Sequence, residues 1–443
     1  MLDRTDIEAI CHLVLEESTT DQTEVLVNAG ESALTRYAGN RIHQNVAETG
    51  SGISIRAVRG KRIGICSTND PRPEALRAAL AKAAELAAIA PENPEFPGLP
   101  SAPRPQPGPD PVAATINSTP EARGAAVREV LAVAAGDSLT ASGALETDYA
   151  RLAVANSEGA FAYGEYTRAS MSAVMQTADS AGRAEAHTAN VSAIDARSLA
   201  QIAAGKALVS RAPRSLEPGK YAVVLEPLAV ADMIFWLGLY GFNAQSYQEK
   251  RSFLCEKLGQ KIAAESISLG DDGLDPRGLP MTFDFEGVPK QPVELISKGV
   301  AVGMVHDSRT AAHAKPPVTS TGHALPAPNP WGPAPTNLFL RPGDATVADM
   351  IRSVDRGLLV TRFHYTNMIH PIHTVFTGMT RDGTFLIEDG EIMAGVKNLR
   401  FTQSILEALE NVKMVGSEGM QCDYAWCPPL LVEGFNFTGV SGE

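Results

Sequence analysis

Short β-type runs separated by tight turns fill residues 24–67 and constrain the fold of this chain more than any other feature. Strand-favouring residues occupy positions 24–27, 33–37, 41–47, 52–58 and 62–67, with Gly, Asn and Ser between them. Connections this short let each run pair with its neighbour only in antiparallel order. We therefore predict an antiparallel meander. A hairpin turn is expected at Gly50 and Gly52, because the third glycine and the helix of a dinucleotide-binding loop are missing.

Helical periodicity surrounds this meander. Thr5 and Glu8 form a capping-box pattern, and apolar residues then recur at helical spacing. Further helices are predicted at 71–90, 119–134 and 195–210, with strands between 139 and 175. The first half of the chain should therefore combine a sheet with several packed helices.

A Pro- and Gly-containing stretch at 212–219 is the predicted boundary between two domains, 1–212 and 213–443. Nine of the 21 residues from 91 to 111 are Pro, so this excursion of the first domain is expected to be extended and exposed. After the boundary, a buried strand at 221–227 and an apolar helix at 228–240 precede mostly short β-type runs. The predicted fold class is α+β, an N-terminal α/β-meander domain followed by a mainly antiparallel β domain.

Charge and apolar content exclude several classes of protein. The formal net charge of −13 disfavours binding to nucleic acid. The most apolar run, 228–242, is 15 residues long and contains Asp232, whereas a membrane helix needs about 20 apolar residues. The acidic N-terminus does not resemble a signal peptide, and five scattered cysteines suit a reducing compartment. We therefore expect a cytoplasmic protein without a membrane segment.

Metal-binding side chains are the main candidates for chemistry, since no phosphate-binding loop and no nucleophile elbow occur. Neither HExxH nor HExxxH is present. His364, His370 and His373 form the densest group of imidazoles, and Cys422 could act as a single ligand. Residues three apart on a strand point to opposite faces, so these histidines are more often structural or substrate-contacting than metal ligands. A small buried thiol is the simpler interpretation of Cys422.

Three stretches resemble the TldD/PmbA family of peptidase components, also called modulators of DNA gyrase. They are GISIRAVRGKRIGICSTND (52–70), FDFEGVP (283–289) with the STG of 320–322, and the run from Gly357 to Phe401 that contains GMTRDG. The resemblance covers nearly the whole chain. In this family, TldD-type subunits carry HExxxH, whose histidines bind zinc with a later Cys. PmbA/TldE-type subunits lack the motif and pair with TldD in a heterodimer.

The branch follows from the residues that stand in place of the motif. If Gly241 is aligned with the motif's glycine, Leu237, Gly238 and Phe242 replace His, Glu and His, and none of them can ligate zinc or transfer a proton. Cys422 falls near the family's cysteine ligand. The resemblance therefore implies a PmbA/TldE-type subunit with no metal of its own and with zinc in a TldD-type partner.

Three functions remain open. The first is a subunit that forms a heterodimer, or a homodimer in isolation, and binds unfolded peptide through free strand edges. The second is a peptidase that acts alone through a non-standard site built from His364, His370, His373 and Cys422. The third is a peptide-binding module without catalysis.

Overall fold

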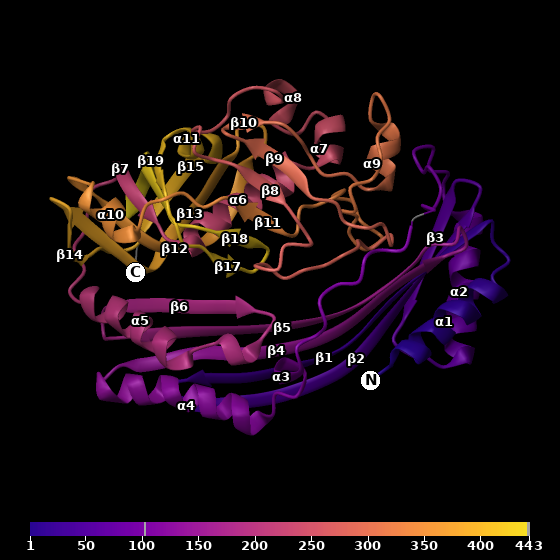
Figure 1. The fold of residues 1–443 in the computed structure, drawn as a ribbon, viewed down its shortest axis with the longest axis horizontal. Coiled ribbons are helices and arrows are strands. Elements are labelled where there is room, and N and C mark those ends of the chain that lie inside the picture. The colour runs from indigo at the N-terminus through magenta and orange to yellow at the C-terminus, as the bar shows by residue number, and fades with distance from the viewer. Residues whose placement is uncertain (102, 441–443) are drawn as a thin grey trace.

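The computed structural model describes residues 1–101 and 103–440, and Figure 1 shows the sheet of the N-terminal half lying along one side of the C-terminal half. The predicted boundary, 212–219, falls between helix α5 (Ala196–Val209) and strand β7 (Gly219–Leu225). Strands β1–β6 form one sheet, and the later strands form two others. The α+β class and the antiparallel sheets are therefore confirmed.

The N-terminal sheet has the strand order β3-β2-β1-β4-β5-β6, with every neighbouring pair antiparallel. Its strands are β1 (Gln22–Ala38), β2 (Arg41–Arg59), β3 (Arg62–Thr68), β4 (Thr140–Asn156), β5 (Phe161–Gln176) and β6 (Ala181–Thr188). Figure 1 shows the long strands curving around the C-terminal half. Because alternate residues of a strand point to opposite faces, one face of this sheet is free to meet that half.

The strands of the meander are fewer and longer than predicted. The runs 24–27 and 33–37 both belong to β1, and the runs 41–47 and 52–58 both belong to β2. The turn predicted at Gly50 and Gly52 is wrong, because both residues lie inside β2. Gly50 pairs with Gly30 of β1, where an added Cβ would lie 2.9 Å from the carbonyl oxygen of Tyr149. Glycine at position 30 lets β1 and β4 approach closely, and the pairing of β1 with β2 continues through Gly30 and Gly50.

Four helices cover the opposite face of the N-terminal sheet: α1 (Arg4–Glu17), α2 (Pro73–Ile89), α4 (Pro120–Gly136) and α5. The capping box of α1 is made by Asp3 and Asp6, two residues before the predicted Thr5 and Glu8, so the predicted capping pair is wrong. The edge strands carry glycines where helices cross them. An added Cβ at Gly64 would lie 2.1 Å from the backbone of α2, and one at Gly182 would lie 2.2 Å from that of α5.

The N-terminal domain contains the same order of elements twice. A helix, three antiparallel strands and a second helix occur as α1-β1-β2-β3-α2 and again as α4-β4-β5-β6-α5. The two units join edge to edge through β1 and β4. A short helix α3 (Ala113–Ile116) and a 3₁₀ turn η1 (Val191–Ala193) complete the domain. Joining two small units in this way buries the first strand of each within one continuous sheet.

The Pro-rich excursion is exposed over only part of its length. Phe96 and Leu99 are buried and pack in a small cluster with Val58. In contrast, the described residues from 103 to 110 are mostly exposed. The expectation of exposure therefore holds for the second part of the excursion and is wrong for the first, because two apolar side chains suffice to anchor it to the sheet.

In the C-terminal domain, one set of strand pairings closes into a ring. β12 pairs with β7, β7 with β19, β19 with β15, β15 with β13, and β13 again with β12. The new strands are β12 (Arg356–His370), β13 (Val375–Glu388), β15 (Leu399–Ser404) and β19 (Leu430–Val440), with β14 (Glu391–Gly395) and β16 (Val412–Val415) attached. Buried Phe363, Phe376, Phe401 and Phe435 pack together, which gives this ring an aromatic core.

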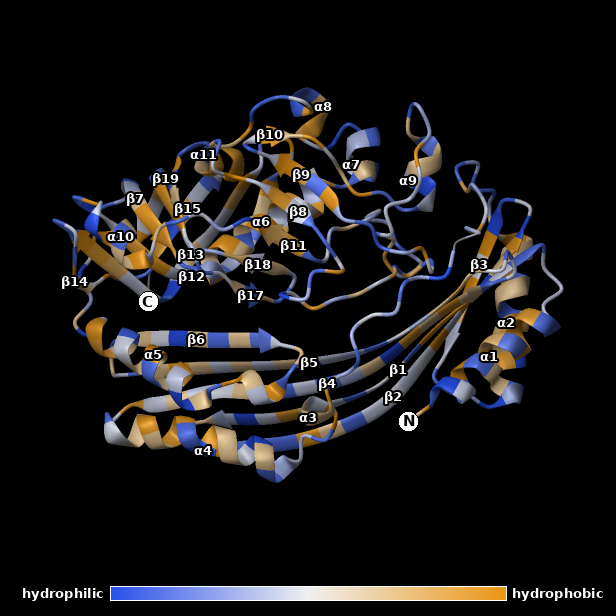
Figure 2. Cartoon of the chain, in the orientation of Figure 1, coloured by the Kyte–Doolittle hydropathy of each residue, from blue (hydrophilic) through white to orange (hydrophobic). Residues whose placement is uncertain are grey.

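The third sheet has the order β10-β9-β8-β11-β18-β17. Its strands are β8 (Leu269–Asp271), β9 (Val293–Ser297), β10 (Val300–Ala301), β11 (Leu338–Leu340), β17 (Met420–Cys422) and β18 (Ala425–Cys427). The helices of the domain are α6 (Pro227–Gly241), α7 (Ala244–Gln248), α8 (Leu254–Lys257), α9 (Ser308–His313), α10 (Val347–Arg352) and α11 (Ile405–Glu410). Figure 2 shows how strongly apolar α6 and the surrounding strands are. No helix in the described part is long and apolar enough to cross a membrane.

The two domains are joined by an apolar contact from the FDFEGVP segment. Phe283 is fully buried and packs in one cluster with Leu152, Val154 and Ala162 of the N-terminal sheet. An ion pair between Lys206 and Glu226, with 2.5 Å between Nζ and Oε2, adds a polar contact near the boundary. These contacts hold the N-terminal sheet against the C-terminal domain.

Candidate functional site

Two adjoining cavities lie between the N-terminal sheet and the C-terminal domain. The larger has a volume of about 780 Å³ and the smaller about 440 Å³. They share four lining residues: His187, Phe235, Asp423 and Tyr424. Volumes of this size are typical of sites for small molecules or short peptides. The cleft is therefore the candidate site.

The larger cavity is mainly apolar. Helix α6 contributes Phe235 and Leu239, and the loop before and within FDFEGVP contributes Met281 and Phe285. The N-terminal wall includes Tyr166 of β5. An apolar chamber of this kind favours apolar ligand side chains, because they are removed from water on binding.

The smaller cavity is the more polar of the two, and its titratable side chains come from four elements and from the turn after β17. β6 provides Glu185 and His187, α6 provides Asp232, β12 provides Arg362 and His364, and β17 ends at Cys422. Burial raises the pKa of Asp232 to about 7, although the nearby Arg362 opposes this rise.

An ion pair and an aromatic pair lie where the two cavities meet. Arg168 of β5 pairs with Asp423, which stands in the turn between β17 and β18. Beside it, the rings of Phe235 and Tyr424 are stacked with centroids 6.2 Å apart. Asp423 has a φ of +52°, a left-handed conformation that Asp tolerates better than most residues. Both residues of this turn, Asp423 and Tyr424, line the two cavities.

Burial favours the uncharged forms of His187 and Cys422 in the smaller cavity. It lowers the pKa of His187, and it raises the pKa of the Cys422 thiol well above the ordinary range. Within the described residues, Nδ1 of His187 is buried and has no hydrogen-bond partner. A neutral thiol is a poor nucleophile, so Cys422 is not activated in this state.

The structure brings together only two of the four candidate His and Cys residues. His364 and Cys422 line the same polar cavity. His370 ends β12, and His373 lies in the exposed turn before β13, with the two rings 4.4 Å apart. The sequence predicts that His370 and His373 point to opposite faces of a strand, but the turn between them brings their rings together. They lie outside the cavities.

The three positions assigned to the degenerate metal motif lie on the apolar side of α6. Leu237 and Phe242 are fully buried in the core of the C-terminal domain, and Gly238 packs against Pro335 and Leu338. The α6 residues that line the same cavity as Cys422 are Leu228, Ala231, Asp232 and Phe235. Of these four, Asp232 alone has a side chain that can ligate a metal or transfer a proton.

The donor set of the polar cavity does not fit a zinc site. Over residues 1–101 and 103–440, no group of three or more His, Cys, Asp or Glu side chains is placed to hold a metal ion. Structural and catalytic zinc sites need at least three such protein ligands. Cys422 is therefore a thiol without the co-ligands of a zinc centre.

Three residues of the polar cavity were not identified from the sequence as site residues. Asp232 carried a usable signal, because it is the only charge in the apolar run 228–242. Glu185 and His187 sit two positions apart on β6 and so share one face of the strand. Nothing in the sequence indicates that this face meets the C-terminal domain.

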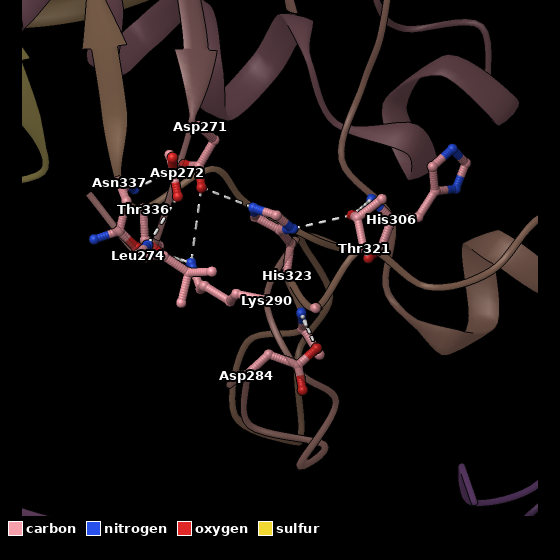
Figure 3. Close-up of polar contacts among 12 residues, drawn as sticks. Asp271, Asp272, Leu274, Asp284, Lys290, His306, Thr321, His323, Thr336 and Asn337 are labelled. Carbon is pink, nitrogen blue, oxygen red and sulfur yellow. Dashed lines mark hydrogen bonds and ion pairs between the residues drawn. The ribbon is translucent and has the colours of Figure 1, made fainter. Parts of the chain in front are cut away.

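Family-like segments of the C-terminal domain meet in a buried polar network beside the apolar cavity (Figure 3). The fully buried Asp271 accepts hydrogen bonds from Nε2 of His323 at 2.8 Å and from the backbone N–H of Asn337 at 2.7 Å. Lys290, also buried, donates to Oδ1 of Asn337 at 2.9 Å, and its Nζ lies 3.9 Å from Asp271. Nδ1 of His323 lies 3.0 Å from the hydroxyl of Thr321 in the STG segment.

A second carboxylate of this region holds a loop rather than a side chain. Asp284 of FDFEGVP accepts hydrogen bonds from the backbone N–H groups of Glu286, Val288 and Ala324, each at 2.9 Å. Burial raises the pKa of Asp284 to about 8. Together with the Asp271 network, these bonds shape the loops that carry Met281, Phe285 and Asn337 into the cavity wall.

The fold is α+β, and two adjoining cavities lie between the N-terminal sheet and the C-terminal part of the chain. Family models of the PmbA/TldA metallopeptidases match three segments: domain 1 at residues 23–87, the central domain at 106–211 and the C-terminal domain at 218–439. The chain belongs to the PmbA/TldD family.

Curated relatives match over part of their length. A metalloprotease of Methanothermobacter thermautotrophicus is 28% identical over 204 residues, which are 45% of this chain and 43% of the relative. A TldD homologue of Buchnera aphidicola, named as a metalloprotease, is 28% identical over 183 residues, 40% of this chain and 37% of the relative. The chain thus spans about two-fifths of the length of these relatives.

Two solved structures share the whole fold. TldE from Thermococcus kodakarensis superposes with a TM-score of 0.88 at 22% identity, covering 98% of this chain and 100% of that one. A Thermotoga maritima protein solved as a modulator of DNA gyrase gives 0.82 at 20% identity, covering 94% and 96%. At these identities, the likeness establishes the fold.

Proposed function

We propose that this chain is a PmbA/TldE-type subunit of a metallopeptidase system that degrades or processes unfolded peptides, and that the zinc lies in a TldD-type partner subunit. The observation that carries the proposal is the wall of the polar cavity. Cys422 faces a helix that contributes Ala231, Asp232 and Phe235 to this cavity, and no imidazole. The absence of HExxxH from the sequence agrees with this wall.

The role of such a subunit is to bind peptide and to complete a shared chamber. The cleft offers the volume and the mixed lining that a peptide needs. β3 and β6 end the N-terminal sheet, and apart from the bridge between Arg62 of β3 and Glu92 their outer edges can pair with an extended chain by β-augmentation. A stable pair with the partner should bury about 1,000 Å² or more. The five unpaired cysteines suit the reducing conditions of the cytoplasm, where we place the pair.

A peptidase acting alone is the second candidate, because His364 and Cys422 do share a cavity. Burial works against it by keeping the thiol protonated. His370 and His373 cannot assist, since they lie outside the cavities.

Metal analysis and peptidase assays test these alternatives. We expect no stoichiometric zinc in the purified chain. Cleavage of unfolded peptide should appear only on mixing with a homologue that carries HExxxH, and chelation should remove it. The mixture should elute from gel filtration as one species near twice the mass of this chain. About one zinc per chain, lost on Cys422→Ala, or equal activity of the chain alone would contradict the proposal.

A further inference from the structure

Asp232 is a carboxylate in a cavity without a counter-ion. It lies on α6, is only partly accessible, and lines the smaller cavity. In the portion of the chain that the structure describes, no basic nitrogen lies within 4.0 Å of its oxygens, and no side chain or N–H group donates a hydrogen bond to them. An isolated carboxylate below the surface is unfavourable unless something else neutralises it.

Each neighbouring cation is already held by another carboxylate. Arg362 donates to Oδ2 of Asp382 from Nε at 2.8 Å, and a second guanidinium nitrogen lies 2.6 Å from the same oxygen. Arg183 holds Glu185 at 2.7 Å. At the chamber boundary, Arg168 pairs with Asp423. Among the described residues, none of these three arginines forms an ion pair with Asp232.

The lining of this cavity favours a cation. Three carboxylates line it, and since Glu185 and Asp423 are paired with Arg183 and Arg168, Asp232 is the one that forms no ion pair in the described structure. His187 adds an acceptor, because its buried Nδ1 has no partner in the described structure and burial favours the neutral ring. A protonated primary amine has three N–H donors and no acceptor, which matches a wall of carboxylates and an imidazole nitrogen.

We propose that the smaller cavity binds a protonated amine of a peptide on Asp232, while the adjoining larger cavity takes apolar side chains of the same peptide. The peptide nature of the ligand rests on the proposed function. The cationic group can come from the amino terminus or from a lysine, since both present an ammonium. The continuity of the two cavities at Phe235 and Tyr424 allows one ligand to occupy both.

Three fluorescent hexapeptides test the proposal on the full chain: a Leu- and Phe-rich peptide with a free amino terminus, its N-acetylated form, and an N-acetylated form with Lys at the first position. Fluorescence anisotropy measures the Kd of each. We expect the free-amine peptide to bind about tenfold or more tightly than the acetylated one. Asp232→Asn should abolish this difference. Glu410→Gln, which removes an exposed carboxylate of the same domain, should preserve it.

Each outcome has a defined meaning. If the acetylated Lys peptide binds as tightly as the free-amine peptide, the site accepts either source of the ammonium. If only the free-amine peptide binds tightly, the site recognises the amino terminus. Equal binding of all three peptides by the unmodified chain, or an amine preference that survives Asp232→Asn, overturns the proposal. Peptidase activity in the mixture with an HExxxH homologue is scored separately, so the proposed function can stand while this inference fails.

Discussion

Arg168 and Asp423, which are 255 positions apart, form an ion pair across the cleft. Arg168 belongs to β5 of the N-terminal sheet, and Asp423 to the turn between β17 and β18 next to Cys422. The pair marks the point where the apolar cavity meets the polar one. Its side chains are 37% and 48% exposed, so solvent screens it and it can open without a large loss of stability.

Breaking this pair should change local motion more than global stability. We expect Arg168→Ala and Asp423→Asn, which keeps a residue that tolerates the left-handed backbone, each to lower the free energy of unfolding by less than about 1 kcal/mol. Hydrogen exchange of the amides in β17 and β18 should become faster in both variants. A double-mutant cycle should give a coupling of about 0.2–1 kcal/mol that shrinks at high salt. Unchanged exchange in this hairpin would show that the pair does not hold it.

Asp232→Asn should stabilise the protein in a pH-dependent way. The folded pKa of about 7 lies above the value of 3.8 in an unfolded chain, so the folded state resists losing this proton. Asp232 therefore lowers stability progressively as pH rises from about 4 to about 7, and by a constant amount above that. The gain of the variant should be near zero at pH 3 and reach at most roughly 4 kcal/mol at pH 8.

Denaturant unfolding of the two proteins at pH 3, 5, 6 and 8 measures this difference. Only the difference is informative, because Asp284 also has a raised pKa and contributes to the pH dependence of both proteins. Glu410→Gln serves as the control and should show little change at any of these values. A gain that is the same at pH 3 and pH 8 would rule out the raised pKa as its cause.

Phe283→Ala should weaken the attachment between the domains. The side chain is fully buried among Leu152, Val154 and Ala162, so its removal leaves a cavity in the contact. We expect a loss of about 3–5 kcal/mol in the free energy of unfolding. Phe285→Ala, at a half-buried position of the same loop, should lose less. If the two losses are equal, Phe283 is not the main contact.

Lys290→Met should be strongly destabilising. Burial alone would raise the pKa of Asp271, but Lys290 and His323 outweigh it and hold the pKa below its usual range. Without the ammonium, a charged carboxylate remains buried, at an expected loss of about 3–5 kcal/mol. Asp271→Asn in the same chain should restore part of it. Lys257→Met, at an exposed position, is the matched control and should be nearly neutral.

The sequence alone determined the class of fold and the longer helices. Helical spacing and caps are local properties, so 71–90, 119–134 and 195–210 correspond closely to α2, α4 and α5. Strand lengths were predicted less well from the sequence. Judged from their sequence neighbours alone, Gly30 and Gly50 are typical of turns. They instead pair with each other between β1 and β2, and this pairing depends on residues distant in sequence.

Only the tertiary structure decided which candidate residues share a site. His364 and Cys422 are 58 positions apart and line one cavity, while His370 and His373, close to His364 in sequence, lie outside it. Asp232 was visible as a lone charge in an apolar helix, but its lack of a counter-ion depends on Arg362 being held by Asp382 and Arg183 by Glu185. Long-range packing sets such distances, and the order of residues along the chain does not encode them locally.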